Sequence, residues 1–407
     1  MMKNKKQGNT MNRYFNKTAL TIICSSMLLL SACGDGGDDF VFVSDKKTFN
    51  VDADVKNVVN VHDVFTYTMP SVAKKDIKAT TLVFTPKGTA PVGGWPVVVW
   101  AHGTTGAADQ CAPSRNVLDG LEKDLIIALV KKGYAVVAPD YEGLGNNNVS
   151  HPYLNLTSAA QSILFAVLEV NKKYDNLSKN WSVIGWSQGG HAALAAAEFN
   201  KALLGYNFKG TVAIAPASYL ADTLDFGRKV ANDTAAAGDL TTATTIGATL
   251  YTYAAIVSSG IKAGQTSFNY NQAFLDAKVP IAQQAETLCS PELAQEFGKD
   301  IQATLQANGG VFSAYQALQA NFKTDPDIAK YLSVNTPAQT KLDKPVYIYQ
   351  GEADTTVPYP ITQKLVDKMA QLGTDVDLEL LPKETHSSAV SKHIPELANT
   401  VDMLMKQ

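Results

Sequence analysis

The chain has 407 residues, of which 45% are hydrophobic and 18% are charged, and its formal net charge at pH 7 is −3. This length and apolar content are ample for a large buried core. The slight negative charge excludes the strongly basic balance that is typical of proteins binding nucleic acid or anionic surfaces, so we expect no nucleic-acid partner.

Residues 1–33 have the pattern of a signal peptide. Basic side chains between Lys3 and Lys17 precede an apolar stretch, 19–30, which is too short to span a bilayer comfortably. The stretch ends in LSAC at 30–33, which resembles a bacterial lipobox, the site where a lipoprotein is cleaved and its cysteine lipidated. The resemblance implies a lipid anchor on Cys33 at the bacterial cell envelope, and Gly34 favours the outer membrane. A plain secreted protein and an uncleaved anchor are the alternatives.

Residues 34–60 are predicted to be a tether and a weakly ordered entry segment. Polar and apolar residues then alternate at 65–69 and 80–84, as in antiparallel strands. Strands that alternate with helices follow, and they predict an α/β fold with a mostly parallel sheet covered on both faces. The predicted strands are 96–100, 135–138, 181–186, 212–215, 346–349 and 377–381, and the predicted helices are 117–132, 157–174, 191–204, 362–372 and 393–406.

The alternation is interrupted between two parts of this core, 61–216 and 345–407. The intervening residues 217–344 have helical periodicity, are rich in Ala, Gln and Thr, and contain no convincing strand. Such a segment is too long for a connecting loop. We therefore predict a helical insertion that forms a cap, or lid, over the ends of the strands.

The sequence GWSQG at 185–189 lies between a predicted strand and a predicted helix. The pattern G-x-S-x-G on such a turn is typical of a nucleophile elbow, because the sharp turn strains the backbone and exposes the serine hydroxyl. The residues two before and two after the serine must be almost free of side chain, which Gly185 and Gly189 satisfy. Ser187 is therefore the predicted nucleophile.

A serine hydroxyl needs a base to remove its proton, and the base needs a third group to hold it. In chains with a nucleophile elbow these follow in the order Ser, Asp or Glu, His, each after a strand. Asp354, in the loop after the strand at 346–349, is the predicted acid, and Glu352 is the alternative. The alternative to both is that the two acids are only solvent-exposed residues of a turn, without a catalytic role. His386, in the loop after the last predicted strand, is the predicted base.

Ester cleavage passes through a tetrahedral oxyanion, which fixed N–H donors stabilise. One donor is expected from the main chain of Gln188, directly after the nucleophile, and the other from the loop HGTTG at 102–106. In that loop Thr104 is the predicted donor and Thr105 the next candidate, and an ordinary glycine turn is the plainer alternative. The other histidines are not expected to transfer protons. His102 is predicted to brace the 102–106 loop and His191 to pack beneath the elbow, and a structural role is predicted for His151, with a place on the rim of the site as the alternative. His393 is expected to be exposed at the start of a helix, and His62 lies in the entry segment.

Cys24 and Cys33 belong to the predicted signal peptide, which leaves Cys111 and Cys289. An even pair in an exported protein suggests one disulfide, and two unpaired buried cysteines are the alternative. No Cys/His metal cluster, phosphate-cradling glycine loop or dinucleotide fingerprint is visible in the sequence. We therefore expect no metal and no cofactor.

The chain resembles the α/β-hydrolase superfamily, and within it the secretory lipase family and its bacterial lipase and esterase relatives. The likeness begins near Phe65 and rests on four segments, which are 102–106 with 111–114, 139–145, 185–190 and 351–358. It implies hydrolysis of carboxylic esters (EC 3.1.1) by a triad of Ser187, Asp354 and His386, with an ester or lipid as substrate and the insertion as a lid. A serine peptidase or aminopeptidase of the same fold and a non-catalytic surface-binding lipoprotein are the competing hypotheses.

Overall fold

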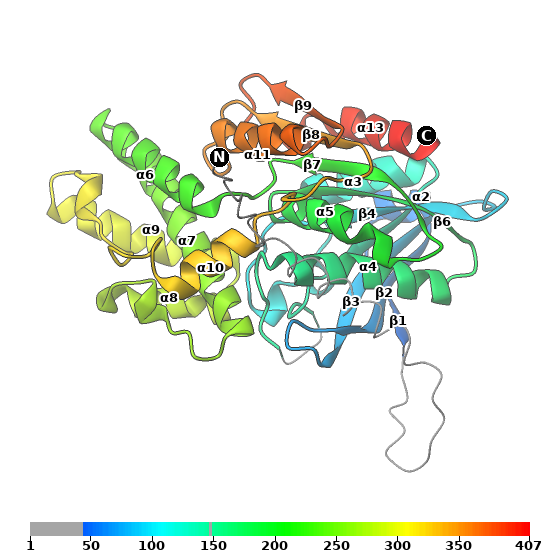
Figure 1. Ribbon diagram of the computed structural model, residues 1–407, viewed down its shortest axis with the longest axis horizontal. Helices are drawn as coiled ribbons and strands as arrows, with labels where there is room; N and C mark the ends of the chain where they lie inside the picture. The colour runs from blue at the N-terminus through cyan, green and yellow to red at the C-terminus, as the bar shows by residue number, and fades with distance from the viewer. Residues whose placement is uncertain (1–43, 146–148) are drawn as a thin grey trace, which may run out of the picture.

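The computed structural model describes residues 44–145 and 149–407. Cys33 and the rest of the predicted signal peptide lie outside the described residues. Within these ranges, no helix combines the length and the apolar character needed to cross a membrane. Figure 1 shows a core built on a sheet, with a group of helices standing at one end of it.

The core contains one sheet, in which nine of the described strands follow the order β1-β2-β3-β5-β4-β6-β7-β8-β9. The pairings from β1 to β5 are antiparallel, whereas every pairing from β5 through β4 to β9 is parallel. The mostly parallel sheet of the sequence analysis is thus confirmed. The strands are β1 (Asp45–Thr48), β2 (Val59–Pro70), β3 (Asp76–Pro86), β4 (Trp95–Ala101), β5 (Ala135–Pro139), β6 (Leu177–Trp186), β7 (Asn207–Ile214), β8 (Val346–Gly351) and β9 (Val376–Leu381).

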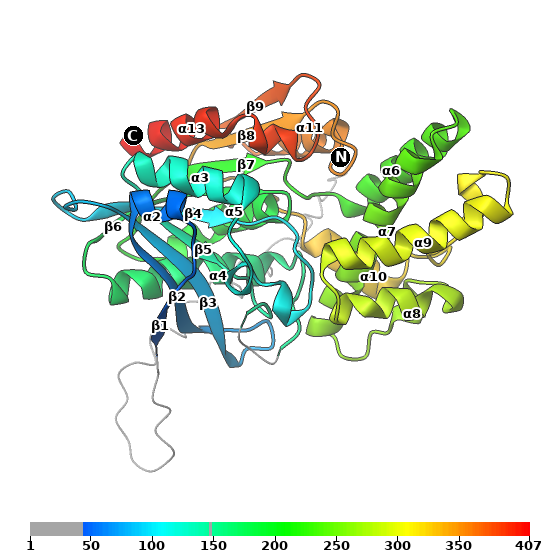
Figure 2. The same ribbon diagram turned by 180° about the vertical axis from the view of Figure 1, so that it is seen from behind.

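Helices cover both faces of the sheet (Figures 1 and 2). In β4, Val97 and Val99 face one apolar core while Val98 and Trp100 face another, so both faces of the strand are buried. This double burial explains why β4 is a continuous apolar run rather than an alternating one. The first face is covered by α4 (Leu156–Lys173), α5 (Gln188–Phe199) and α11 (Tyr359–Gln371), and the second by α2 (Ala53–Val58), α3 (Gly120–Lys131), α12 (Ser388–Ser391) and α13 (Ile394–Lys406).

Residues 220–334 contribute five α-helices and no strand of the sheet, and we refer to this segment as the cap. Its helices bury an apolar cluster of their own, distinct from the two clusters on the sheet. The chain enters the cap after β7 and leaves it before β8, so the cap begins at the carboxyl ends of the parallel strands. The helices are α6 (Leu220–Ala236), α7 (Leu240–Gly264), α8 (Val279–Ala282), α9 (Ser290–Ala307) and α10 (Pro326–Val334).

Residues 44–60 are more ordered than their composition predicts. β1 pairs in antiparallel fashion with β2 and extends the sheet by one edge strand. The short helix α2 begins at Asp52, whose side chain accepts a hydrogen bond from the main-chain N–H of Val55. Val55 is fully buried against the sheet-covering helices. Main-chain pairing, one helix cap and the burial of Phe49, Val51, Val55 and Val59 in the second apolar core therefore order this part of the chain.

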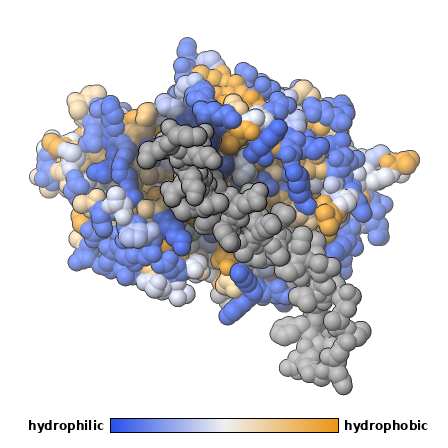
Figure 3. Space-filling model, in the orientation of Figure 1, coloured by the Kyte–Doolittle hydropathy of each residue, from blue (hydrophilic) through white to orange (hydrophobic). Residues whose placement is uncertain are grey.

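The face of the molecule shown in Figure 3 is largely hydrophilic where its residues are described. The apolar tip at its right edge is the loop between β3 and β4, in which Val92 is fully exposed. The other apolar areas on this face are small and scattered, as is usual for a globular protein.

Candidate active site

Ser187 occupies a strained turn between a strand and a helix. β6 ends at Trp186 and α5 begins at Gln188, with Ser187 between them at φ 58° and ψ −113°. A positive φ is costly for a residue that carries a Cβ, and such strain is characteristic of functional positions. The neighbouring glycines are required by space, because a Cβ on Gly189 would collide with the carbonyl oxygen of Ala101 and one on Gly185 with the main chain of Gly189. The geometry is that of a nucleophile elbow.

The structure pairs His386 with Asp354. The imidazole Nδ1 lies 2.7 Å from Asp354 Oδ2, and the aspartate side chain is completely buried. Asp354 Oδ1 accepts hydrogen bonds from the main-chain N–H groups of Thr356 (2.8 Å) and Val357 (2.9 Å). These bonds hold the carboxylate in one orientation. Because the carboxylate can only accept, the neutral imidazole carries its proton on Nδ1 and has a free lone pair on Nε2.

Glu352, the alternative acid, is exposed at the start of the same loop. β8 ends at Gly351, and the first buried side chain of the loop after it is that of Asp354, so the side chain of Glu352 stays in solvent. The structure therefore brings Asp354, and not Glu352, to His386. Gln350 supports the arrangement from β8, because its side-chain N–H groups reach Asp354 Oδ2 (3.3 Å) and the carbonyl of Val357 (2.9 Å).

His386 also lies against the elbow itself. The indole N–H of Trp186, the residue before Ser187, donates to the main-chain carbonyl of His386 (3.1 Å), and the two rings are 5.0 Å apart. The Nε2 atom of His386 is buried and has no hydrogen-bond partner among the described residues. The bond from the Ser187 hydroxyl to this atom is thus not formed here, although catalytic hydrogen bonds often tighten only when substrate is bound.

One predicted oxyanion donor, Gln188, belongs to the elbow, and the other, Thr104, lies in a loop packed beside it. Gln188 is the first residue of α5, and the first N–H groups of a helix have no partner within the helix. Thr104 lies in the loop after β4, where its hydroxyl is 2.8 Å from the hydroxyl of Tyr153. Gly103 must be a glycine, since a Cβ there would lie 2.7 Å from the Trp186 ring. The small residues of HGTTG therefore let this loop approach the elbow closely.

A family model described as the alpha/beta hydrolase family matches residues 98–400. The chain belongs to this family. A comparison with curated protein sequences gave no match. Solved structures with the same fold include a protein from Legionella pneumophila (20% identity, TM-score 0.66, 87% of this chain and 94% of that chain covered). They also include the rice cell wall degrading esterase LipA from Xanthomonas oryzae (19%, 0.64, 89% and 97%) and Candida antarctica lipase A in its closed state (18%, 0.63, 88% and 82%).

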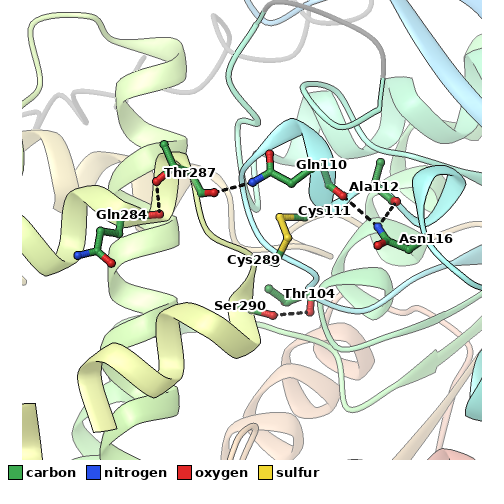
Figure 4. Close-up of a disulfide and its surroundings, with 9 residues drawn as sticks. All are labelled: Thr104, Gln110, Cys111, Ala112, Asn116, Gln284, Thr287, Cys289 and Ser290. Atoms are coloured by element: carbon green, nitrogen blue, oxygen red, sulfur yellow. Dashed lines mark hydrogen bonds between the residues drawn. A yellow bond between two sulfur atoms is a disulfide. The ribbon is translucent and has the colours of Figure 1, made fainter. Parts of the chain in front are cut away.

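In this hydrolase the loop after β4 is fastened to the cap. Cys111 and Cys289 form a disulfide, which decides between the two possibilities left open by the sequence. Ser290, directly after Cys289, donates its main-chain N–H to the carbonyl of Thr105 (2.8 Å) and its hydroxyl to the carbonyl of Thr104 (3.2 Å). Figure 4 shows the disulfide and, beside it, the hydrogen bond between Ser290 and Thr104. The start of α9 is therefore tied to the loop after β4 by one disulfide and two hydrogen bonds.

The remaining histidines of the hydrolase make structural contacts. The Nδ1 atom of His62 lies 2.7 Å from the carbonyl of Phe49, and His393 pairs with Glu396 at the start of α13. Three others are buried, and burial lowers the pKa of each from 6.5: His102 to about 3, His151 to about 4 and His191 to about 4. All three are neutral at neutral pH.

Two acids that follow β5 also have structural partners. Asp140 accepts hydrogen bonds from the Thr80 hydroxyl (2.5 Å) and the Ser114 main chain (3.1 Å), and burial raises its pKa to about 6. Glu142 accepts from the main chain of Val72 and from Ser158, and burial raises its pKa as well. Neither carboxylate reaches Ser187. Among the described residues, no group of His, Cys, Asp or Glu is arranged to hold a metal ion.

A cavity of about 60 Å³ extends from Ser187 into the cap. Its walls are mainly aliphatic and aromatic, and none of the residues that line it is charged. This cavity was not predictable from local sequence patterns, because its walls come from the ends of β-strands and from three cap helices that are distant in the chain. The main apolar contributors are Leu220, Leu224, Leu250, Val257, Phe322 and Leu332.

Proposed function

We propose that this hydrolase is a serine carboxylic ester hydrolase of the carboxylesterase or lipase type, which acts through an acyl-enzyme on Ser187. The observation that carries the proposal is the buried Asp354–His386 pair set against a strained serine elbow. That arrangement supplies an oriented base whose Nε2 lone pair is available for the hydroxyl proton.

The reaction begins with attack of Ser187 Oγ on the acyl carbon of the ester, while His386 Nε2 takes the hydroxyl proton. Asp354 stabilises the resulting imidazolium through the 2.7 Å bond to Nδ1. The main-chain N–H groups of Gln188 and Thr104 hold the negatively charged oxygen. The tetrahedral intermediate then expels the alcohol, which leaves with the proton from His386, and the acyl group stays on Ser187. Water then attacks the acyl carbon while His386 removes one of its protons. The bond to Ser187 Oγ breaks, His386 returns the proton to Oγ, and the carboxylic acid is released.

The cavity favours an ester with an uncharged, apolar acyl group. An aminopeptidase needs a carboxylate to bind the charged amine of its substrate, and no carboxylate lines the cavity beside Ser187. An apolar acyl chain, in contrast, gains about 0.8 kcal/mol for each methylene it buries. The cavity therefore supports the esterase hypothesis over the peptidase hypothesis.

Substitution of the nucleophile tests the proposal. Ser187→Ala is expected to abolish hydrolysis of p-nitrophenyl butyrate and labelling by a fluorophosphonate, with little change in the thermal unfolding midpoint. Ser313→Ala, which removes an exposed hydroxyl on the cap, serves as the matched control and should retain both activities. Residual hydrolysis by Ser187→Ala at a tenth of the wild-type rate would exclude Ser187 as nucleophile. A wild-type protein that neither hydrolyses the ester nor reacts with the probe would support the non-catalytic binding hypothesis.

We also propose that the mature protein is attached to the bacterial cell envelope through a lipid on Cys33. The support is the sequence LSAC at 30–33 after a basic and then an apolar segment. Mass spectrometry of the purified protein decides the matter. An acylated N-terminal Cys33 would support the anchor, and an unmodified N-terminus at another residue would refute it.

A further inference from the structure

The short segment from His151 to Tyr153 lies against both predicted oxyanion donors. The Nε2 atom of His151 is 2.8 Å from the side-chain nitrogen of Gln188. Two residues later, the hydroxyl of Tyr153 is 2.8 Å from the hydroxyl of Thr104. His151, Tyr153 and Gln188 are each at most 3% exposed. One rigid tripeptide therefore connects the start of α5 with the loop after β4.

The direction of the first hydrogen bond follows from the surroundings of His151. Its Nδ1 lies 2.6 Å from the main-chain carbonyl of Glu142, which can only accept, so Nδ1 carries the proton. Nε2 is then an acceptor, and the Gln188 amide donates to it. Burial lowers the pKa of His151 to about 4, which keeps the ring neutral and the acceptor present at the pH of an ester assay. The side chain of Gln188, whose main-chain N–H is the first predicted oxyanion donor, is thus fixed.

The segment is itself held in place by the cap and by stacked rings. Tyr331 of α10 donates its hydroxyl proton to the carbonyl of Tyr153 (2.8 Å). Gly260 of α7 lets that helix approach the same backbone, since a Cβ there would lie 2.8 Å from the Tyr153 nitrogen. The His151 ring is stacked on Tyr141, with the ring centres 6.1 Å apart. These contacts leave His151 and Tyr153 little freedom to move relative to the elbow.

We propose that His151 and Tyr153 are positioning residues, which set the placement of the Gln188 and Thr104 main-chain donors around the oxyanion. The inference rests on the proposed ester hydrolase function. Donors of an oxyanion hole act only when they are 2.7–3.1 Å from the developing charge. A small displacement of a donor therefore reduces the stabilisation of the transition state, while the binding of the ester in the ground state is almost unaffected. The loss should therefore fall on kcat rather than on KM.

The direct test removes one hydroxyl. Tyr153→Phe keeps the ring in the cavity wall but cannot bond to Thr104, and it is expected to lower kcat on p-nitrophenyl butyrate about tenfold, less than the loss of a whole donor. KM should stay within about twofold, since ground-state contacts are unchanged. Affinity for an alkyl boronic acid, which forms a tetrahedral adduct on the serine, should fall by the same factor as kcat/KM. Tyr315→Phe removes another buried hydroxyl, bonded to Asp300 in the cap, and should lower stability without changing kcat.

A double-mutant cycle identifies the contact. Thr104→Val removes the partner hydroxyl but leaves the main-chain N–H, so Tyr153→Phe with Thr104→Val should be no worse than the more damaging single variant. For His151, the side chain of Gln can still accept from Gln188 whereas Leu cannot, so His151→Gln should retain most of the kcat that His151→Leu loses.

The outcomes separate this inference from the proposed function. An active wild type with Tyr153→Phe at full kcat would overturn the positioning role alone. Multiplying effects in the double variant, or a loss confined to KM, would also overturn it by showing that Tyr153 acts only as a wall of the cavity. A wild type that neither hydrolyses the ester nor reacts with a fluorophosphonate would overturn both.

Discussion

Asp354→Asn changes the tautomer of His386, and the structure predicts in which direction. Asp354 Oδ1 accepts two main-chain N–H groups, from Thr356 and Val357. In the variant the amide oxygen must remain at this position, because an NH₂ group there would face two donors. The NH₂ group of the asparagine therefore replaces Oδ2, which in the wild type faces Nδ1 of His386 at 2.7 Å.

The amide NH₂ can only donate, so His386 must present a lone pair at Nδ1 and carry its proton on Nε2. That imidazole cannot accept the proton of Ser187. Loss of the correct tautomer at an intact triad lowers kcat by about 10⁴-fold, which corresponds to about 5 kcal/mol of transition-state stabilisation. We expect a loss of this size for Asp354→Asn.

Steady-state hydrolysis of p-nitrophenyl butyrate by the purified variant measures the effect, and thermal unfolding establishes that the variant is folded. Glu352→Gln provides the matched control, because it makes the same chemical change two residues away on an exposed side chain. It should keep kcat within about twofold of wild type, as expected of a surface substitution. A loss of less than tenfold for Asp354→Asn, or a larger loss for Glu352→Gln, would refute the reasoning.

Two further predictions concern stability. The Cys111–Cys289 disulfide closes a loop with a sequence separation of 178, for which chain entropy gives a stabilisation of about 5 kcal/mol. Cys289→Ser should lower the urea midpoint accordingly, and an unchanged midpoint would contradict this estimate. The pKa of each of three buried histidines, His102, His151 and His191, is lowered from 6.5 to about 3 or 4. Between these values each binds a proton in the unfolded chain but not in the folded one, which lowers the free energy of unfolding as the pH drops from 6.5 to 4. Carboxylates whose pKa is raised by burial act in the opposite direction, and they are Glu122 (about 7), Asp140 (about 6), Glu142 and Glu198. His191→Gln removes one histidine contribution, so its thermal midpoint should fall less across this window than that of the wild type, and an equal pH slope would argue against the reasoning.

Much of the architecture was predictable because it depends on local patterns. Continuous apolar runs such as β4 arise when both faces of a strand are buried, and glycines around Ser187 are demanded by one sharp turn. The order of nucleophile, acid and base along the chain likewise follows from where parallel strands end. For these reasons the sequence determined the α/β class and the candidates Ser187, Asp354 and His386.

The tertiary structure decided what depends on residues far apart in the chain. Burial at the end of β8 brings Asp354 rather than Glu352 to His386, although both acids fit the sequence pattern. The loop that contains Thr104 contacts Cys289 and Tyr153, which belong to other parts of the chain. Contacts of this kind leave no periodic pattern in the local sequence. The apolar cavity beside Ser187 is defined by the packing of cap helices on strand ends. Side-chain packing of this kind is a property of the whole fold, which is why only the three-dimensional arrangement revealed it.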